Sequence, residues 1–350
     1  MLSSDAMSNE SITTRPSFPP VRRVLPALVT QVLVAMVIAG AFAGLYIGLQ
    51  KAPAPTHLPI AVVNAQLATG TAHALGAKAD IREAATDAQA QELVRTHQVV
   101  AALVPGATGA TLYTASANGR SATGAATALA TGAAHAARMT ITSTRDLVPL
   151  TTSDSQGLSG FYLVFGTTLA AFILAQTMNA LAALAGLRVR VIVTVIGSIA
   201  AAIVVATIAG PIYTAVPAPF LAVIALLSLL AVGVSLSSLA ISTLIGPMGT
   251  IVSTLVFTTI GNATSGATIS AFLLPPAIAT IGAGLPPGAA FRAITTAGYF
   301  NGAGIAGPLL TLAVWIAGAS AALLLAHRAR SRRSEVHEGL RSPALAQASG

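Results

Sequence analysis

The chain has 350 residues, a formal net charge of +8 and no cysteine, and only 8% of its residues are charged against 54% that are hydrophobic. Soluble domains carry about 25% charged residues, so this composition indicates a membrane protein. The lack of cysteine excludes disulfides and thiolate metal sites. The positive charge gathers beside the ends of apolar runs, where it orients membrane proteins, so we expect no binding to nucleic acid.

Residues 1–23 are polar and contain several prolines and arginines, and we expect them to form a cytoplasmic tail. Residues 24–49 follow as an uncharged, mostly apolar run. As a helix this run is about 39 Å long, which is enough to cross a bilayer. The apolar core of a signal peptide has only about 7–15 residues, so we expect an uncleaved membrane anchor.

Three glycines in this first span, Gly40, Gly44 and Gly48, repeat every four residues and therefore share one helical face. Small residues at this spacing let two helices approach closely within a membrane. The glycine face could pack against another span of the same chain or against a second copy in a homodimer. The sequence leaves both alternatives open.

Residues 50–158 contain acidic as well as basic side chains, and they predict a small extracytoplasmic α/β domain. Short apolar runs predict three strands, and two longer segments predict helices. The predicted strands are Leu58–Val63, Val99–Val104 and Thr111–Ala115, and the predicted helices are Asp87–Thr96 and Ala122–Ala137.

Residues 155–334 contain no Asp or Glu and consist largely of long apolar runs, which is typical of protein embedded in a bilayer. Five further membrane-spanning helices are predicted here. They are 159–184, 191–213, 220–245, 250–271 and 307–326. Residues 272–306 contain two Pro-Pro pairs, which a straight spanning helix does not tolerate, so we expect a re-entrant or interfacial hairpin.

Three clusters of arginine determine the expected topology, because basic residues beside membrane spans remain on the cytoplasmic side. The clusters are Arg22–Arg23, Arg188–Arg190 and Arg328–Arg333. Six spans place all three clusters on one side, with both termini and the 327–350 tail in the cytoplasm. An excess of arginine over lysine, with abundant alanine, favours a bacterial plasma membrane.

These elements together predict an α-helical integral membrane protein with six transmembrane helices. The small α/β domain lies between helices 1 and 2, outside the cytoplasm. The re-entrant hairpin lies between helices 5 and 6 on the same side.

A stripe of polar side chains runs along the fifth predicted span, where Thr250, Thr254, Thr258 and Asn262 repeat every four residues. Such a stripe on an apolar helix could line a translocation pathway. Threonine hydroxyls also often bond to their own helix, so packing between helices is the alternative. The same two interpretations apply to Gln176 and Asn179 in the second span.

Arg292 is the only charged residue between the fourth span and the C-terminal tail. At the outer surface it could contact lipid headgroups or a substrate at the exit of a pathway. The alternative is that its long side chain simply reaches the membrane interface.

The sequence contains no candidate catalytic, cofactor-binding or metal-binding site. A phosphate-binding loop needs a Gly-Lys-Ser/Thr sequence, and the only lysines, Lys51 and Lys78, lack that context. The histidines have no metal-ligand spacing, and no Gly-x-Ser-x-Gly occurs. We therefore expect no enzyme and no cofactor in this chain, and any ATP would bind a partner subunit.

Several short segments resemble membrane proteins related to the phage-infection-protein family, which groups with the permeases of type-2 ABC exporters. Leu58–Asn64 resembles the segment after the first span, and 146–150 with Phe161–Leu163 resembles the entry into the second. Three further segments resemble the family's region before the last span. They are Gly261–Gly266, Leu285–Ala289 and Tyr299–Phe300.

The resemblance implies an exporter-like domain of six helices with a re-entrant hairpin, dimerisation and a separately encoded ATPase. We expect the chain to be the permease subunit that exports a lipid-like or amphipathic compound. Its partners would be membrane lipids, a second copy and the ATPase. The alternative is a non-transporting envelope receptor, or a scaffold for secretion or cell-wall assembly.

Overall fold

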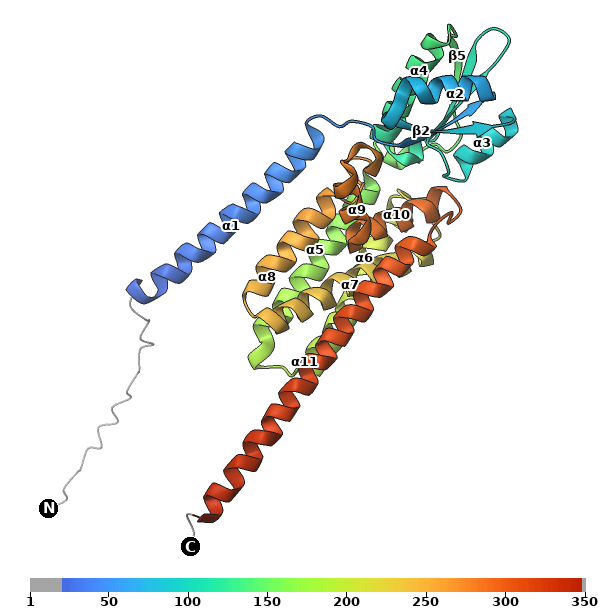
Figure 1. The fold of residues 1–350 in the computed structure, drawn as a ribbon. Helices are drawn as coiled ribbons and strands as arrows, with labels where there is room; N and C mark the ends of the chain where they lie inside the picture. The colour runs from blue at the N-terminus through green and yellow to red at the C-terminus, as the bar shows by residue number, and fades with distance from the viewer. Residues whose placement is uncertain (1–20, 348–350) are drawn as a thin grey trace, which may run out of the picture.

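The computed structural model describes residues 21–347, in which a helical bundle carries a small α/β domain at one end (Figure 1). The first helix, α1 (Val21–Gln50), runs beside the bundle and reaches the α/β domain through a short connection. Large apolar side chains along α1, such as Leu33 and Met36, remain more than half exposed, as expected for a helix surrounded by lipid.

The α/β domain contains one five-stranded sheet in the order β2-β1-β3-β4-β5. All neighbouring strands are parallel except the β3–β4 pair, which is antiparallel. The strands are β1 (Leu58–Val63), β2 (Ala79–Ala84), β3 (Ala101–Pro105), β4 (Ala110–Thr114) and β5 (Ile141–Asp146). The prediction of a small α/β domain is thus confirmed.

Three helices cover the two faces of this sheet. Small apolar residues of α2 (Ala65–Leu75) and α4 (Arg120–Ala136) pack with Leu58, Ile60 and other residues on one face. Residues of α3 (Asp87–Arg95) pack on the other face. Helices α3 and α4 lie close to their predicted positions, whereas α2, β2 and β5 were not predicted.

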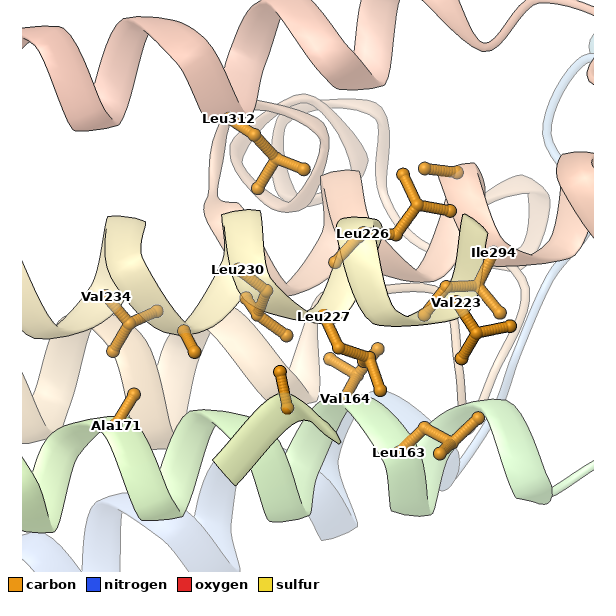
Figure 2. Packing of buried hydrophobic residues seen from close by; sticks show 14 of the residues in the cluster. Leu163, Val164, Ala171, Val223, Leu226, Leu227, Leu230, Val234, Ile294 and Leu312 are labelled. Atoms are coloured by element: carbon orange, nitrogen blue, oxygen red, sulfur yellow. The ribbon is translucent and has the colours of Figure 1, made fainter. Parts of the chain in front are cut away.

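The bundle is built around α7, which packs against α5, α6, α10 and α11. Figure 2 shows α7 between α5 and α11, with Leu227 of α7 and Val164 of α5 pointing toward each other. The helices are α5 (Ser159–Ala180), α6 (Leu187–Thr207), α7 (Phe220–Ile245), α8 (Met248–Ser253), α9 (Pro276–Gly284), α10 (Pro286–Tyr299) and α11 (Ala306–Gln347).

Two of these helices continue with wider, π-helical turns: α6 into Ile208–Ile212 and α8 into Thr254–Gly261. Short 3₁₀ turns complete the described structure. They are Gly76–Lys78, Ser116–Asn118, Thr152–Asp154, Leu181–Ala183 and Ala271–Leu273.

Five helices of the described chain are long and apolar enough to cross a membrane, which indicates a multi-pass membrane protein. They are Leu28–Gln50, Ser159–Ala183, Leu187–Ile212, Phe220–Ile245 and Ala306–Ala329. Four agree closely with predicted spans, and α11 runs on as one helix past the predicted end at Ala326. The sixth crossing remains a prediction.

The predicted fifth span, 250–271, is not one continuous helix. An apolar helix begins at Met248, but helical structure ends at Ala263 and turns and bends follow. Gly266 lies within these bends at φ +87°, a conformation that glycine adopts readily. At 1.5 Å per residue the helical part is about 24 Å long, which is short for a bilayer core of about 30 Å.

Two short helices, α9 and α10, follow and are joined at Leu285. Each begins with proline, whose fixed φ angle suits the first turn of a helix. The backbone of α9 at Gly282 approaches the chain at Thr264 very closely, because a Cβ built on Gly282 would lie 1.9 Å from the Thr264 carbonyl oxygen. The pair lies between the bundle and the α/β domain (Figure 1), and its re-entry into the membrane remains a prediction.

Two phenylalanines hold the α/β domain against the bundle. Phe300, which follows α10, is 1% exposed and packs into the core on the α3 side of the sheet. Phe272, which precedes α9, packs against the opposite core, and its carbonyl oxygen accepts a 2.9 Å hydrogen bond from the Thr56 N–H. The Ser121 hydroxyl also accepts a 3.0 Å hydrogen bond from the Ser270 N–H.

Candidate functional site

The predicted polar stripe lies on α8 and its π-helical continuation, and most of its hydrogen-bonding groups have partners. Thr254 Oγ1 donates to the Thr250 carbonyl oxygen at 2.7 Å, and Thr258 Oγ1 donates to that of Thr254 at 2.5 Å. Asn262 Nδ2 donates to the Phe257 carbonyl oxygen at 3.0 Å. Back-bonding of this kind satisfies the hydroxyls within the helix, as the alternative interpretation of the stripe expects.

The π-helical turns and the stripe coincide over Thr254–Gly261. Wider turns of this type often occur at functional sites. Thr250, Thr254 and Thr258 remain half-buried, whereas Asn262 is 1% exposed. The Oδ1 atom of Asn262 has no hydrogen-bond partner among the described residues, so this amide places an unsatisfied acceptor inside the apolar bundle.

The stripe lies at the edge of the bundle, since its π-helical segment packs beside α1. The side of α1 that carries the glycines is open. No atom of the described residues outside α1 lies within 4 Å of a Cβ built on Gly40, Gly44 or Gly48. In the described structure this face does not pack against another span of the same chain, and the partly buried residues of α1 lie on a neighbouring face. The homodimer alternative remains a prediction.

Gln176 and Asn179 have different surroundings although they are one turn apart on α5. Gln176 Oε1 accepts a 2.7 Å hydrogen bond from Thr250 Oγ1, which joins α5 to the stripe. Asn179 instead lines a cavity of about 280 Å³ with Thr250 and Arg190 at the end of the bundle distant from the α/β domain.

Arg190 was not singled out as a pathway residue, yet it is 4% exposed in the bundle. Its Nη1 atom donates to the Met178 carbonyl oxygen at 3.5 Å. Its position in the cavity places a guanidinium beside Asn179 and Thr250. Sequence reasoning grouped Arg190 with Arg188 as a topological signal, and only the helical phase of α6 could have distinguished the buried arginine from the exposed one.

Arg292 is half-buried on α10, and its Nη2 atom donates to the Ala283 carbonyl oxygen at 2.8 Å. This bond joins α10 to the end of α9. The side chain is thus engaged in holding the two short helices together, which neither sequence interpretation anticipated. Its contact with lipid or substrate remains a prediction.

A second groove, which the sequence did not indicate, lies between α5 and the π-helical end of α6. Its volume is about 720 Å³, and Tyr162 and Tyr213 are exposed at its edge. Leu163 and Ala209 form part of its inner wall. The groove adjoins the end of the bundle that faces the α/β domain, because Ser153 and Ser159 also line it.

A third cavity, of about 300 Å³, lies where the α/β domain meets the bundle. Asp154, 9% exposed, accepts hydrogen bonds from the Leu158 and Ser159 N–H groups and so caps the start of α5. A carboxylate at a helix N-terminus satisfies free N–H groups and complements the helix dipole, so this acid has a structural role.

Within residues 21–347 no group of three His, Asp or Glu side chains could hold a metal ion. No known protein family, curated protein or solved structure matches this chain.

Proposed function

We propose that this chain is the membrane permease subunit of a type-2 ABC exporter-like transporter for a lipid-like or amphipathic compound. The observation that carries the proposal is the position of the polar stripe. Thr250, Thr254 and Thr258 are half-buried on a π-helical segment at the edge of the bundle, beside a span whose glycine face is open.

The pathway proposed here runs along the seam between α1 and the π-helical segment. Apolar parts of a substrate would contact the exposed leucines and valines of α1, and its polar groups would meet the half-buried threonines. A second copy of the chain, seated on Gly40, Gly44 and Gly48, would close this seam from the outside.

The energy source of the proposed transporter lies on another chain. Residues 155–334 contain no Asp or Glu, so the bundle has no carboxylate to couple transport to protons or sodium. The chain also lacks a phosphate-binding loop. A separately encoded ATPase acting at the cytoplasmic face of a bacterial plasma membrane completes the proposal.

The transport proposal is tested by Thr258→Leu, with Thr207→Leu as the matched control. Both hydroxyls bond to the carbonyl oxygen four residues earlier and both residues are half-buried, but Thr207 lies on α6, outside the polar stripe. We expect Thr258→Leu to slow the outward movement of a fluorescent phospholipid analogue about tenfold, equivalent to about 1.4 kcal/mol in the barrier. The control should transport at the unmodified rate.

The assay uses cells that express the protein with its genomic neighbours, and purification from them tests for an associated ATPase. An unchanged rate in Thr258→Leu together with no nucleotide-hydrolysing partner would refute the transporter proposal.

The dimer is tested separately by Gly44→Leu, with Ala35→Leu on the opposite face of α1 as the control. A Cβ built at position 44 meets no described atom outside α1 within 4 Å, so we expect the monomer to fold normally. We expect Gly44→Leu to abolish a disulfide cross-link between copies that carry Cys at Ala41, and Ala35→Leu to retain it. Equal cross-linking in both variants would place the dimer contact elsewhere.

A second candidate function is a non-transporting envelope receptor or scaffold for secretion or cell-wall assembly. It is favoured by the attachment of the α/β domain, which Phe272 and Phe300 hold from opposite sides of its sheet. A domain held in this way presents a fixed surface to a partner. Partner capture that persists in Thr258→Leu, without any transport by the unmodified protein, would favour this function.

A further inference from the structure

An apolar groove of about 410 Å³ lies at the end of the bundle distant from the α/β domain. It is formed by the consecutive helices α6 and α7 together with α11. Leu187, Val191, Leu236, Leu323 and Leu324 provide most of its walls. Its volume is within the range of about 300–1,000 Å³ that is usual for ligand pockets.

The groove has a buried floor and an open side. Leu236 and Leu323 are 4% and 5% exposed, and they belong to the tightly packed cluster between α7 and α11. Leu324 and Ile192, at the rim, are 58% and 57% exposed. In a membrane such an opening faces the hydrocarbon, so an acyl chain can enter it sideways without crossing water.

Basic side chains stand at one end of this apolar groove. Arg188 in the first turn of α6 and His327 on α11 both line it, and Arg328 follows directly on α11. Residues 155–334 contain no Asp or Glu, so Arg188 has no carboxylate within this stretch of the chain to neutralise its charge. A helix start disfavours a nearby cation, so Arg188 is not placed there to stabilise α6.

We propose that this groove is a binding site for an anionic phospholipid of the adjoining leaflet. One acyl chain lies along Leu187, Val191 and Leu323, and the phosphate is held at Arg188. Basic pockets between transmembrane helices on the cytoplasmic side are a physically favoured site for anionic headgroups. The site is independent of the proposed transport, since no residue of the polar stripe lines the groove and lipid binding needs no ATPase.

The test measures thermal unfolding of the full-length, delipidated protein in detergent. Dioleoylphosphatidylglycerol should raise the unfolding temperature at lower concentration than dioleoylphosphatidylcholine. Arg188→Gln should raise the half-saturating concentration of the anionic lipid about fivefold, as one basic contact predicts. Arg95→Gln, an exposed arginine on α3 in the α/β domain, should leave it unchanged.

Two further variants test the acyl-chain part of the site. Ser320→Phe fills the groove, and Leu324→Asn makes an exposed part of its wall polar without disturbing the packed core. Both should remove the preference for the anionic lipid, and glycerol 3-phosphate alone should give no shift.

Equal responses to the two lipids, or an unchanged half-saturation in Arg188→Gln, would overturn the proposal. So would a preference that survives in Leu324→Asn, or a shift produced by glycerol 3-phosphate, because the ligand would then be bound without its chain. None of these readouts depends on transport, so the site and the transporter can fail separately.

Discussion

His97 and Phe300 join the α/β domain to the bundle through two stacked rings. Their centroids are 4.1 Å apart and the rings are inclined by 8°. Burial lowers the pKa of His97 from its ordinary value of 6.5, an effect that a hydrogen bond with Asn118 partly offsets. A charged imidazole is costly in this position because the ring lies against an apolar core.

This contact predicts that the attachment of the domain weakens on acidification. The unfolded state binds a proton at His97 as pH falls through 6.5, whereas the folded state resists until its lower pKa. Stability should therefore fall with decreasing pH between these two values and then level off. Thermal unfolding from pH 7.5 to 5 would show this slope.

The control is His97→Asn, because asparagine tolerates the φ of +61° at this position. The variant should be less stable at pH 7.5, since the stacking is lost, and its pH dependence should be smaller. An identical pH slope in both proteins would exclude His97 as its source.

At the scale of elements, the packing of α9 against the turn at Thr264 depends on glycine. A Cβ on Gly282 would lie 1.9 Å from the Thr264 carbonyl oxygen, whereas one on Gly284 would meet no described atom within 4 Å. Gly282→Ala should therefore destabilise the protein by about 1–3 kcal/mol, as overpacking does. Gly284→Ala is the matched control, and equal unfolding temperatures of the two variants would contradict the close approach.

The elements that the sequence predicted well are those with buried apolar side chains. Strand β1, for example, is nearly continuous in apolar residues and lies at its predicted position. The edge strands β2 and β5 were missed because both expose mostly polar side chains. Helix α2 was missed because its sequence is weakly patterned, and it is defined locally by Asn64, whose side chain accepts hydrogen bonds from the Gln66 and Leu67 N–H groups.

The candidate sites could be predicted only in part. The spacing of Thr250, Thr254 and Thr258 correctly places them on one helical side, but the spacing does not contain the π-helical turns that determine their partners. The cavities and grooves depend on the packing of different helices against one another, so periodicity within one helix carries no information about them.

At the scale of the whole molecule, two arginine-containing segments meet at one end of the bundle. Arg188 and His327, which precedes Arg328, line the same groove, and the α/β domain lies at the other end (Figure 1). The positive-inside rule therefore predicts that the groove lies on the cytoplasmic side and the α/β domain outside.

This orientation can be tested by cysteine labelling, since the chain has no native cysteine. Ala107→Cys lies on an exposed turn of the α/β domain, and Leu184→Cys lies on the loop before α6 with an exposure of 84%. An impermeant maleimide applied to intact cells should label position 107 and should label position 184 only after lysis. The reverse pattern would invert the proposed topology.

Phe272 and Phe300 stand just before α9 and just after α10, so these two attachments of the α/β domain belong to one short stretch of chain. The side chains that fix the α/β domain from both sides of its sheet are therefore carried by this pair of helices. We therefore expect any tilt of α9 and α10 to move both phenylalanines and to change the orientation of the sheet.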